Sequence, residues 1–313
     1  CNPNSETIEA SSKNEEGLIT RALQIHDRVL TLDTHADTPL RMLEPGFDLS
    51  ERHDPYETGS KVDYPRMKEG GLDAIFFAAF VAQDIRNDTS NERAKILVLQ
   101  MIDAVVASTQ ENSNDVGLAL NPDDAYELEK ANKRAIYIGM ENGYPIGNNL
   151  NNLELFFNAG VRYITLVHSS NNDLSDSATD QNGPEHQGIS AFGKKVITEM
   201  NRLGIIVDIS HGSDDAFYDA IAISKAPIIA SHSNARSVFD HKRSMSDEML
   251  ELVTENRGVV NVTPFPSYLR EKLENPERDV AISLLLKDAK SPSDMTSSER
   301  AEMTQAYKKI NQK

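Results

Sequence analysis

Short apolar runs alternate with longer amphipathic stretches along most of the chain. Seven runs rich in Val, Ile, Phe and Ala predict β-strands: Val29–Thr34, Leu72–Val81, Ala135–Met140, Val161–Val167, Ile205–Ile209, Pro227–Ala230 and Gly258–Val262. Most of them are continuously apolar, which is typical of strands buried on both faces of a parallel sheet. Another run, Val116–Leu120, is short and ends on no reactive residue, so we place it at the periphery.

The stretches between the strands carry helix signals. The spacing of apolar residues and the capping side chains predict helices over 91–109, 122–132, 190–203, 213–224 and 246–256. Ser213 and Ser246 are typical N-caps, and each precedes two acidic residues that the helix dipole favours. Repeated strand–helix units predict a (β/α) barrel or a doubly wound sheet. A (β/α)8 barrel needs one strand more than we find, and the segment from Leu269 onward predicts helix.

Residues able to bind metal follow several of the predicted strands. Four of the eight histidines stand there: His35, His168, His211 and His232. Glu141 follows the third strand, and Asp37 forms a His-x-Asp pair with His35, whose side chains share one side of an extended segment. The carboxyl ends of parallel barrel strands open onto one face, so these distant residues are predicted to converge.

Imidazole and carboxylate are the ligands of catalytic zinc. A His-x-Asp pair, one Glu and two further His are too many for one tetrahedral ion, but they suit two ions that share a carboxylate and keep positions open for water. Asp208 lies within its strand run, so we read it as a supporting carboxylate and not a ligand. The remaining histidines are read as ordinary surface residues: His26, His53, His186 and His241.

Several of these stretches together resemble the membrane (renal-type) dipeptidases, zinc metallopeptidases with an amidohydrolase-like barrel. The resemblance covers about residues 18 to 270 and rests on six stretches: Leu32–Pro39, Ile138–Gly143, Arg162–Ser169, Gly188–Gly193, Glu199–His211 and Ala230–Arg236. It implies a TIM-like barrel that hydrolyses dipeptides, including those with a C-terminal D-residue, by means of a metal-bridging hydroxide.

The resemblance also implies roles for individual residues. His35 and Asp37 would bind the first zinc, His211 and His232 the second, and Glu141 would bridge the two ions. His168 would contact the substrate and stabilise the oxyanion. Arg243 stands where the family has an arginine that binds the substrate carboxylate, a task that suits the guanidinium fork.

The chain departs from the family pattern after the seventh strand. The family's eighth strand ends in a Gly-Ser-Asp-Phe-Asp-Gly-like motif whose first Asp transfers protons, and no such motif follows Val262-Thr263-Pro264-Phe265. We therefore expect residues 18–313 to form a C-terminally truncated barrel that lacks its eighth strand, with open edges between the first and last strands. Loss of the acid–base Asp would lower turnover by about 10²–10⁴.

Composition limits the classes of molecule that this chain is expected to bind. The net charge is −17 and the pI is near 4.9, which argues against nucleic acid and against a polybasic membrane patch. The only cysteine is Cys1, and residues 1–17 read as a polar tether, as in a bacterial lipoprotein whose Cys1 carries lipid. We thus expect a lipid-anchored envelope protein that faces the periplasm or the cell exterior, takes a small dipeptide and can form a homo-oligomer. Two alternatives stay open: another amidohydrolase-like metal-dependent hydrolase, and a non-catalytic envelope lipoprotein on a degraded peptidase fold.

Overall fold

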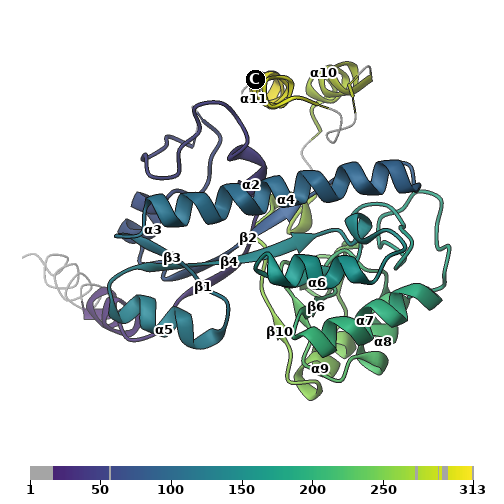
Figure 1. Cartoon of the computed structure of the whole chain (residues 1–313), viewed down its shortest axis with the longest axis horizontal. Coiled ribbons are helices and arrows are strands. Elements are labelled where there is room, and N and C mark those ends of the chain that lie inside the picture. Colours follow the sequence, from purple (N-terminus) through teal and green to yellow (C-terminus); the bar gives the residue numbers. More distant parts are fainter. Residues whose placement is uncertain (1–16, 56–57, 272–273, 288, 291–294, 312–313) are drawn as a thin grey trace, which may run out of the picture.

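A curled parallel sheet forms the centre of the computed structural model, which describes residues 17–311 except 56–57, 272–273, 288 and 291–294 (Figure 1). Seven strands follow one another in spatial order: β1 (Leu32–Ala36), β2 (Ala74–Phe80), β4 (Arg134–Glu141), β5 (Val161–Thr165), β6 (Ile206–Asp208), β7 (Ile229–Ala230) and β10 (Val259–Val260). Every neighbouring pair is parallel. β3 (Val116–Leu118) pairs only with the first half of β4. Among the described residues no strand joins β10 to β1, so the barrel is open there.

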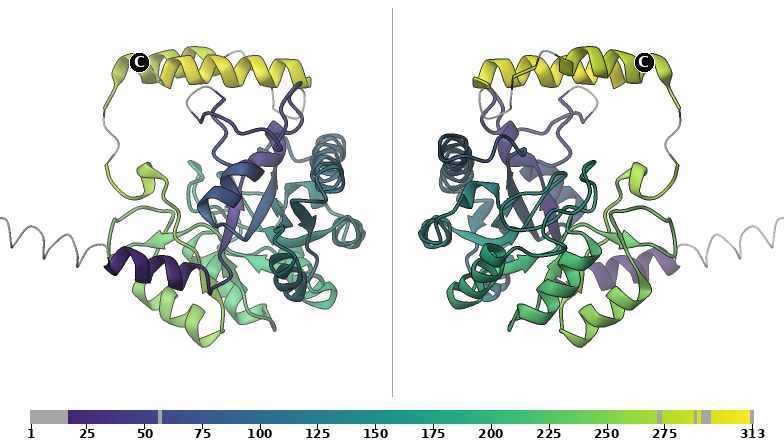
Figure 2. Two further views of the ribbon diagram at one scale, coloured as in Figure 1. Left: turned by 90° about the vertical axis from the view of Figure 1, so that its left-hand side faces the viewer. Right: turned by 90° about the vertical axis from the view of Figure 1, so that its right-hand side faces the viewer.

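Most helices cover the outer face of the sheet and connect its strands, whereas the last two, which follow β10, lie beside each other and apart from the sheet (Figures 1 and 2). Residues 17–26 are helical. The other helices are α2 (Thr38–Arg41), α3 (Tyr64–Gly70), α4 (Asp88–Glu111), α5 (Pro122–Lys130), α6 (Asn151–Asn158), α7 (Ala191–Leu203), α8 (Asp214–Ile223), α9 (Asp247–Glu255), α10 (Pro276–Lys287) and α11 (Ser297–Asn311). Short elements complete the set: the 3-10 turns η1 (Tyr144–Ile146) and η2 (Pro266–Tyr268), and the paired strands β8 (Asn234–Ala235) and β9 (Ser244–Met245). None of the described helices is both long and apolar enough to cross a bilayer.

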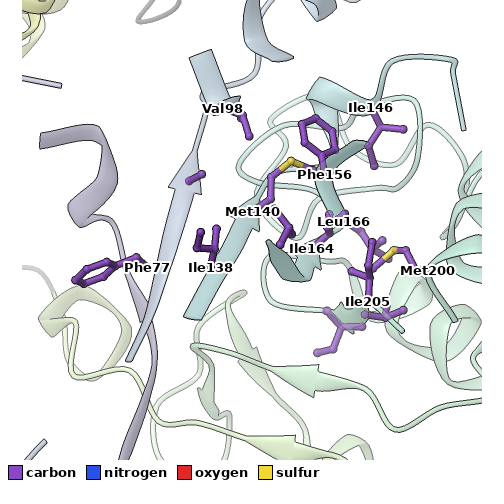
Figure 3. Close-up of a cluster of buried hydrophobic side chains, with 14 of the residues drawn as sticks. Phe77, Val98, Ile138, Met140, Ile146, Phe156, Ile164, Leu166, Met200 and Ile205 are labelled. Atoms are coloured by element: carbon purple, nitrogen blue, oxygen red, sulfur yellow. The ribbon is translucent and has the colours of Figure 1, made fainter. Parts of the chain in front are cut away.

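The core has two parts, one on each face of the sheet. The larger cluster packs strand side chains against α4, α6 and α7, and it includes Ile138, Met140, Phe156 and Met200, all fully buried (Figure 3). The smaller cluster fills the barrel interior with aromatic rings, where Phe76 lies 4.8 Å from Tyr137 and 5.0 Å from Tyr163 between ring centroids. A Cβ at position 139 would collide with the Tyr163 ring, so a glycine there lets the ring fill the interior.

The predicted strands are present, and the barrel class that lacks one strand is confirmed. The first strand is displaced: it runs over Leu32–Ala36 and not Val29–Thr34, because Val29 belongs to the turn after the N-terminal helix, where its N–H donates to the His26 carbonyl. His35 therefore lies inside β1.

His53 was predicted to be an ordinary surface residue, and this is wrong. It is buried against the Phe47 ring, and its Nε2 lies 2.7 Å from the Asp48 carbonyl oxygen. Cys1 and residues 1–16 of the predicted tether lie outside the described residues, and Gly17 is already helical.

Exposed apolar side chains line the two open edges of the sheet. Val29 and Leu32 are 50% and 43% exposed on the β1 side, and Val259 and Val262 are 54% and 74% exposed on the β10 side. Unpaired strand edges with apolar side chains favour association between molecules.

We expect the chain to self-associate as its concentration rises, and the double substitution Val259→Lys with Val262→Lys to reduce this, because charge on an edge strand opposes pairing. Sedimentation velocity over a concentration series measures this self-association. The matched control is Val238→Lys, since Val238 is 77% exposed outside the sheet edges. A wild-type chain that stays monomeric at every concentration contradicts the prediction.

Asp63 anchors α3 through a buried carboxylate. It accepts hydrogen bonds from the backbone N–H groups of His53 and Arg66 and from the Arg66 guanidinium, at 2.9, 2.7 and 2.6 Å. Burial alone raises the pKa of Asp63, but these hydrogen bonds and the Arg66 charge outweigh it and hold the pKa below its ordinary 3.8. Its stabilising contribution is therefore complete above pH 3.8 and disappears as the pH falls through the lowered value.

Replacing Asp63→Asn should lower the free energy of unfolding at pH 7 by about 1–2 kcal/mol. The difference from wild type should shrink below about pH 4, where the native carboxylate also becomes protonated. Urea titrations at several pH values test this, with Asp123→Asn, on the exposed first turn of α5, as the control. A difference that does not change with pH would show that the charge is not involved.

Candidate metal centre

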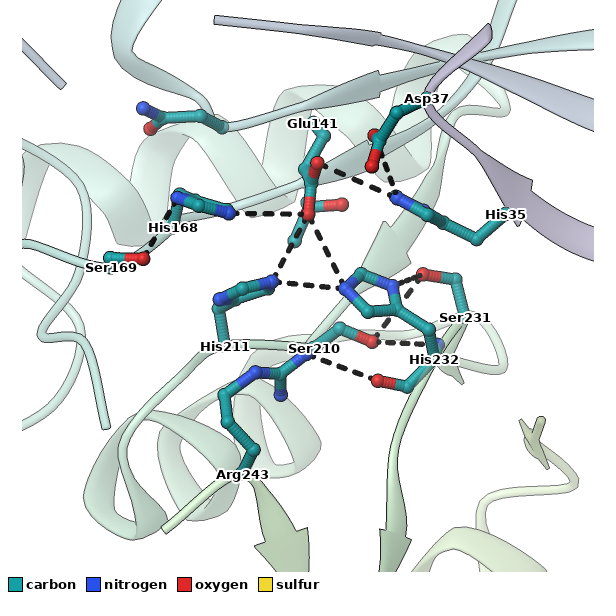
Figure 4. A network of polar contacts seen from close by, with 12 residues as sticks. His35, Asp37, Glu141, His168, Ser169, Ser210, His211, Ser231, His232 and Arg243 are labelled. Atoms are coloured by element: carbon teal, nitrogen blue, oxygen red, sulfur yellow. Dashed lines mark hydrogen bonds and ion pairs between the residues drawn. The ribbon is translucent and has the colours of Figure 1, made fainter. Parts of the chain in front are cut away.

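The carboxyl ends of five strands bring the predicted residues together (Figure 4). His35 comes from β1, with Asp37 directly after the strand, and Glu141 is the last residue of β4. His168, His211 and His232 follow β5, β6 and β7 within two or three residues. The parallel arrangement thus gathers side chains that are up to 197 residues apart, as the hydrogen bond from Thr34 Oγ1 to the Ser231 carbonyl across the barrel illustrates.

Glu141 is the point on which the imidazoles converge. Its Oε1 lies 3.1 Å from His211 Nε2, 3.3 Å from His232 Nε2 and 3.7 Å from His168 Nε2. Its Oε2 lies 3.5 Å from His35 Nε2, which is also 3.3 Å from Asp37 Oδ1. The Glu141 side chain is 3% exposed while that of Asp37 is 63% exposed, so the centre is closed behind Glu141 and open on the Asp37 side.

The donor atoms form two groups that share Glu141. His35, Glu141 and His232 can supply three atoms to one ion, and Glu141, His168 and His211 can supply three to another. His211 Nε2 and His232 Nε2 are only 2.9 Å apart, so at least one of these ring nitrogens presents a lone pair toward the centre. Neutral imidazole and carboxylate donors at one centre fit divalent transition metals, zinc among them.

At most of these positions the surroundings favour the protonation states that bind metal, namely a neutral imidazole or an ionised carboxylate. Burial lowers the pKa of His211 well below 6.5 with help from the Arg243 charge, and burial also lowers the pKa of His232 and of His168. Burial opposes ionisation of Glu141, but the His35 charge and the imidazole hydrogen bonds outweigh it and lower the Glu141 pKa well below 4.5. Burial likewise lowers the pKa of His35, yet Glu141 and Asp37 more than reverse this and raise it.

Several residues that support the centre were not singled out from the sequence. Tyr163 Oη lies 2.9 Å from His35 Nδ1, Ser231 Oγ lies 2.8 Å from His232 Nδ1, and Ser169 Oγ lies 3.0 Å from His168 Nδ1. Ser231 Oγ donates in turn to Asp208 Oδ2 at 2.6 Å. Asp208 is fully buried and also accepts from Thr165 Oγ1 and from the backbone N–H groups of Ser210 and Ser231, which agrees with the supporting role read from its position.

The backbone at His211 adopts an unusual conformation. Its φ of 71° lies in the left-handed region, which a non-glycine residue occupies rarely and at a cost. The Ala178 N–H donates to the His211 carbonyl at 2.9 Å, and Ser177 Oγ donates to the His168 carbonyl at 2.6 Å. The loop between β5 and α7 therefore fastens two of the site histidines through their main chains.

Arg243 lies beside the centre, directly before β9. It is 5% exposed, its Nη2 donates to the His232 carbonyl at 3.1 Å, and its guanidinium carbon is 5.4 Å from the centroid of the Tyr268 ring. Burial lowers the pKa of Arg243. Its Nε has no hydrogen-bond partner, and no carboxylate among the described residues lies within ion-pair distance. A buried guanidinium with an unpartnered Nε–H is suited to receive an anionic group from a ligand.

Solved structures share this architecture. The probable dipeptidase PvdM from Pseudomonas aeruginosa superposes with a TM-score of 0.77 at 26% identity, over 95% of this chain and 79% of that one. A metallopeptidase from Rhodobacter sphaeroides, solved with a phosphinate mimic of the dipeptide L-Ala-D-Ala, superposes with a TM-score of 0.68 at 25% identity, over 78% of this chain and 76% of that one.

Sequence relatives give the same family. The dipeptidase tcpJ of Claviceps purpurea is 33% identical over 225 residues, which cover 70% of this chain and 53% of tcpJ. An uncharacterized dipeptidase of Schizosaccharomyces pombe is 34% identical over 255 residues, 77% of this chain and 60% of that protein. The chain thus spans little more than half the length of these curated relatives. The family model for membrane dipeptidases matches residues 19–310, and the chain therefore belongs to the membrane dipeptidase family, peptidase family M19.

Proposed function

We propose that this chain hydrolyses dipeptides in a reaction that depends on two divalent metal ions, and that these ions are zinc. The observation that carries the proposal is the position of Glu141, a buried carboxylate that belongs to both groups of potential ligands. His35 and Asp37 would complete one coordination set. His211 and His232, which both face Glu141 Oε1, would complete the other and leave His168 for the substrate. When bound, two such ions supply an activated water and polarise the peptide carbonyl.

The substrate would be held through its terminal carboxylate. Arg243 is buried next to His232, its Nε–H has no hydrogen-bond partner among the described residues, and an arginine fork matches the geometry of a carboxylate. A peptide held in this way would present its scissile carbonyl to the metal centre, because Arg243 contacts the main chain of His232, one of the proposed ligands. Tolerance for a D-residue at the C-terminal position is part of the proposal, and it is supported by the dipeptide mimic that the relative from Rhodobacter sphaeroides binds.

His168 would donate a hydrogen bond to the oxyanion that develops on the substrate carbonyl. Ser169 Oγ lies 3.0 Å from His168 Nδ1, and a proton donated from that hydroxyl leaves the ring proton on Nε2, the atom aimed at the centre. The lowered pKa of His168, caused by burial, keeps the ring neutral near pH 7. A fixed donor directed at developing negative charge is a large contributor to catalysis.

Metal analysis combined with a dipeptide assay tests the function. The purified chain should bind about two zinc ions, and it should hydrolyse L-Ala-L-Ala and L-Ala-D-Ala in a reaction that chelation stops and zinc restores. Hydrolysis of lactones or phosphoesters but not dipeptides would favour a different metal-dependent hydrolase. Two bound ions with no hydrolysis of any of these substrates would indicate a binding protein, and absence of metal binding would refute the proposal.

A further inference from the structure

Hydrogen bonds support the rings of His35 and His232 from behind. His232 Nδ1 is 2.8 Å from Ser231 Oγ, and because that hydroxyl donates its proton to Asp208 Oδ2, its oxygen accepts from His232 Nδ1–H. The proton of His232 is thereby held on Nδ1, and the lone pair of Nε2 faces the centre. His35 Nδ1 has an equivalent partner in Tyr163 Oη at 2.9 Å.

His211 lacks this support. Its Nδ1 is buried, and among the described residues it has no hydrogen-bond partner. The ring is oriented by its backbone, which has a φ of 71° and whose carbonyl accepts from Ala178 N–H. Its Nε2 faces Glu141 Oε1 at 3.1 Å, in the same way that His232 Nε2 does at 3.3 Å.

This difference affects metal binding because a neutral histidine that coordinates through Nε2 must carry its proton on Nδ1. For His35 and His232 a nearby oxygen accepts that proton in a hydrogen bond. For His211 no acceptor for that proton lies among the described residues, and burying an unpartnered N–H group is unfavourable. Removing such supporting partners from a metal ligand typically weakens metal binding about 10–100-fold.

We propose that the two metal positions differ in affinity. The ion shared by His211 and His232, of which only His232 is supported, is held about 10–100-fold more weakly than the ion contacting His35. Tyr163 acts here as a positioning residue for the tighter position. The inference rests on the proposed two-metal function, and it concerns the affinity that this chain's own side chains give to each metal position. When less than two equivalents of metal are supplied, a form of the protein with one bound ion is therefore expected.

Stepwise metal titration tests the inference without an activity assay. The metal-free chain is titrated with Co²⁺ followed by absorbance, and with Zn²⁺ against a chromophoric chelator. Two binding steps with dissociation constants about 10–100-fold apart are expected. His211→Ala should remove the weaker step and keep the tighter one, and Tyr163→Phe should weaken the tighter step about 10–100-fold. Tyr137→Phe is the matched control, because Tyr137 lies in the same interior cluster but its hydroxyl donates to the Asn121 carbonyl.

The outcomes separate this inference from the proposed function. Two steps of equal affinity, or loss of the tighter step in His211→Ala, would overturn the inference while dipeptide hydrolysis could still be measured. Absence of any bound ion would instead refute the proposed function. Circular dichroism of each metal-free variant verifies folding, and if Tyr163→Phe does not fold, His211→Ala alone decides the order of affinities.

Discussion

The Glu141→Gln chain should hold far less than two equivalents of metal after gel filtration, and its kcat/KM for dipeptides should fall at least about a thousandfold. Glu141 belongs to both ligand groups, so one substitution removes a donor from each. An amide has a neutral oxygen, and its nitrogen is a donor that would face the imidazole Nε2 atoms of His211 and His232 or the Nε2 of His35. Both ion positions should therefore weaken together.

Controls identify the cause of this loss. Glu255→Gln changes an exposed acid at the end of α9 and should leave metal content and activity unchanged. Asp208→Asn should have a smaller effect, about 10–100-fold on metal affinity, because Asp208 acts on His232 through Ser231. If Glu141→Gln retains two tightly bound ions, Glu141 does not bridge the centre, and the assignment of the site is wrong.

Much of the fold followed from local patterns because each strand is a short, nearly continuous apolar run. Such runs predicted where the strands lie and that they are parallel, and the polar residues after them predicted one converging face. The start of β1 was less predictable: Val29 has the same apolar character as the strand residues, but it lies in the turn after the first helix, where its N–H donates to the His26 carbonyl. α6 was missed because its two buried side chains, Leu153 and Phe156, are too few to show a clear helical period.

The convergence of the histidines on Glu141 and the supporting position of Asp208 were predictable, but the hydroxyl groups behind the histidines were not. His35, Glu141, His211 and His232 are unusual residues at the ends of apolar runs, so the sequence itself marks them. Tyr163 looks like an ordinary strand aromatic, and only the tertiary structure shows that its hydroxyl meets His35. The serine next to a histidine, as at Ser231 and Ser169, is a signal that could have been used, because it places a hydroxyl within reach of Nδ1.

Replacing Arg243→Met should raise KM for dipeptides about a hundredfold or more while the metal content stays near two ions. Arg243 is 5% exposed, and its Nη2 donates to the His232 carbonyl while its Nε has no hydrogen-bond partner among the described residues. Burying a cation without a counter-charge destabilises a folded protein. The substrate carboxylate would supply that charge. Without substrate, we therefore expect the cation at position 243 to lower the stability of the protein.

Two independent measurements test this role of Arg243. Arg243→Met should unfold at the same or a higher temperature than wild type, because methionine fills the space without a charge. Wild type should prefer a dipeptide over the same dipeptide amide about a hundredfold, and this preference should disappear in Arg243→Met and be partly kept in Arg243→Lys, which has the charge but not the fork. Arg202→Met, an exposed change on α7, should alter neither property. If Arg243→Met keeps its preference for the free carboxylate, another group receives the substrate terminus, because the variant no longer has a cation at this position.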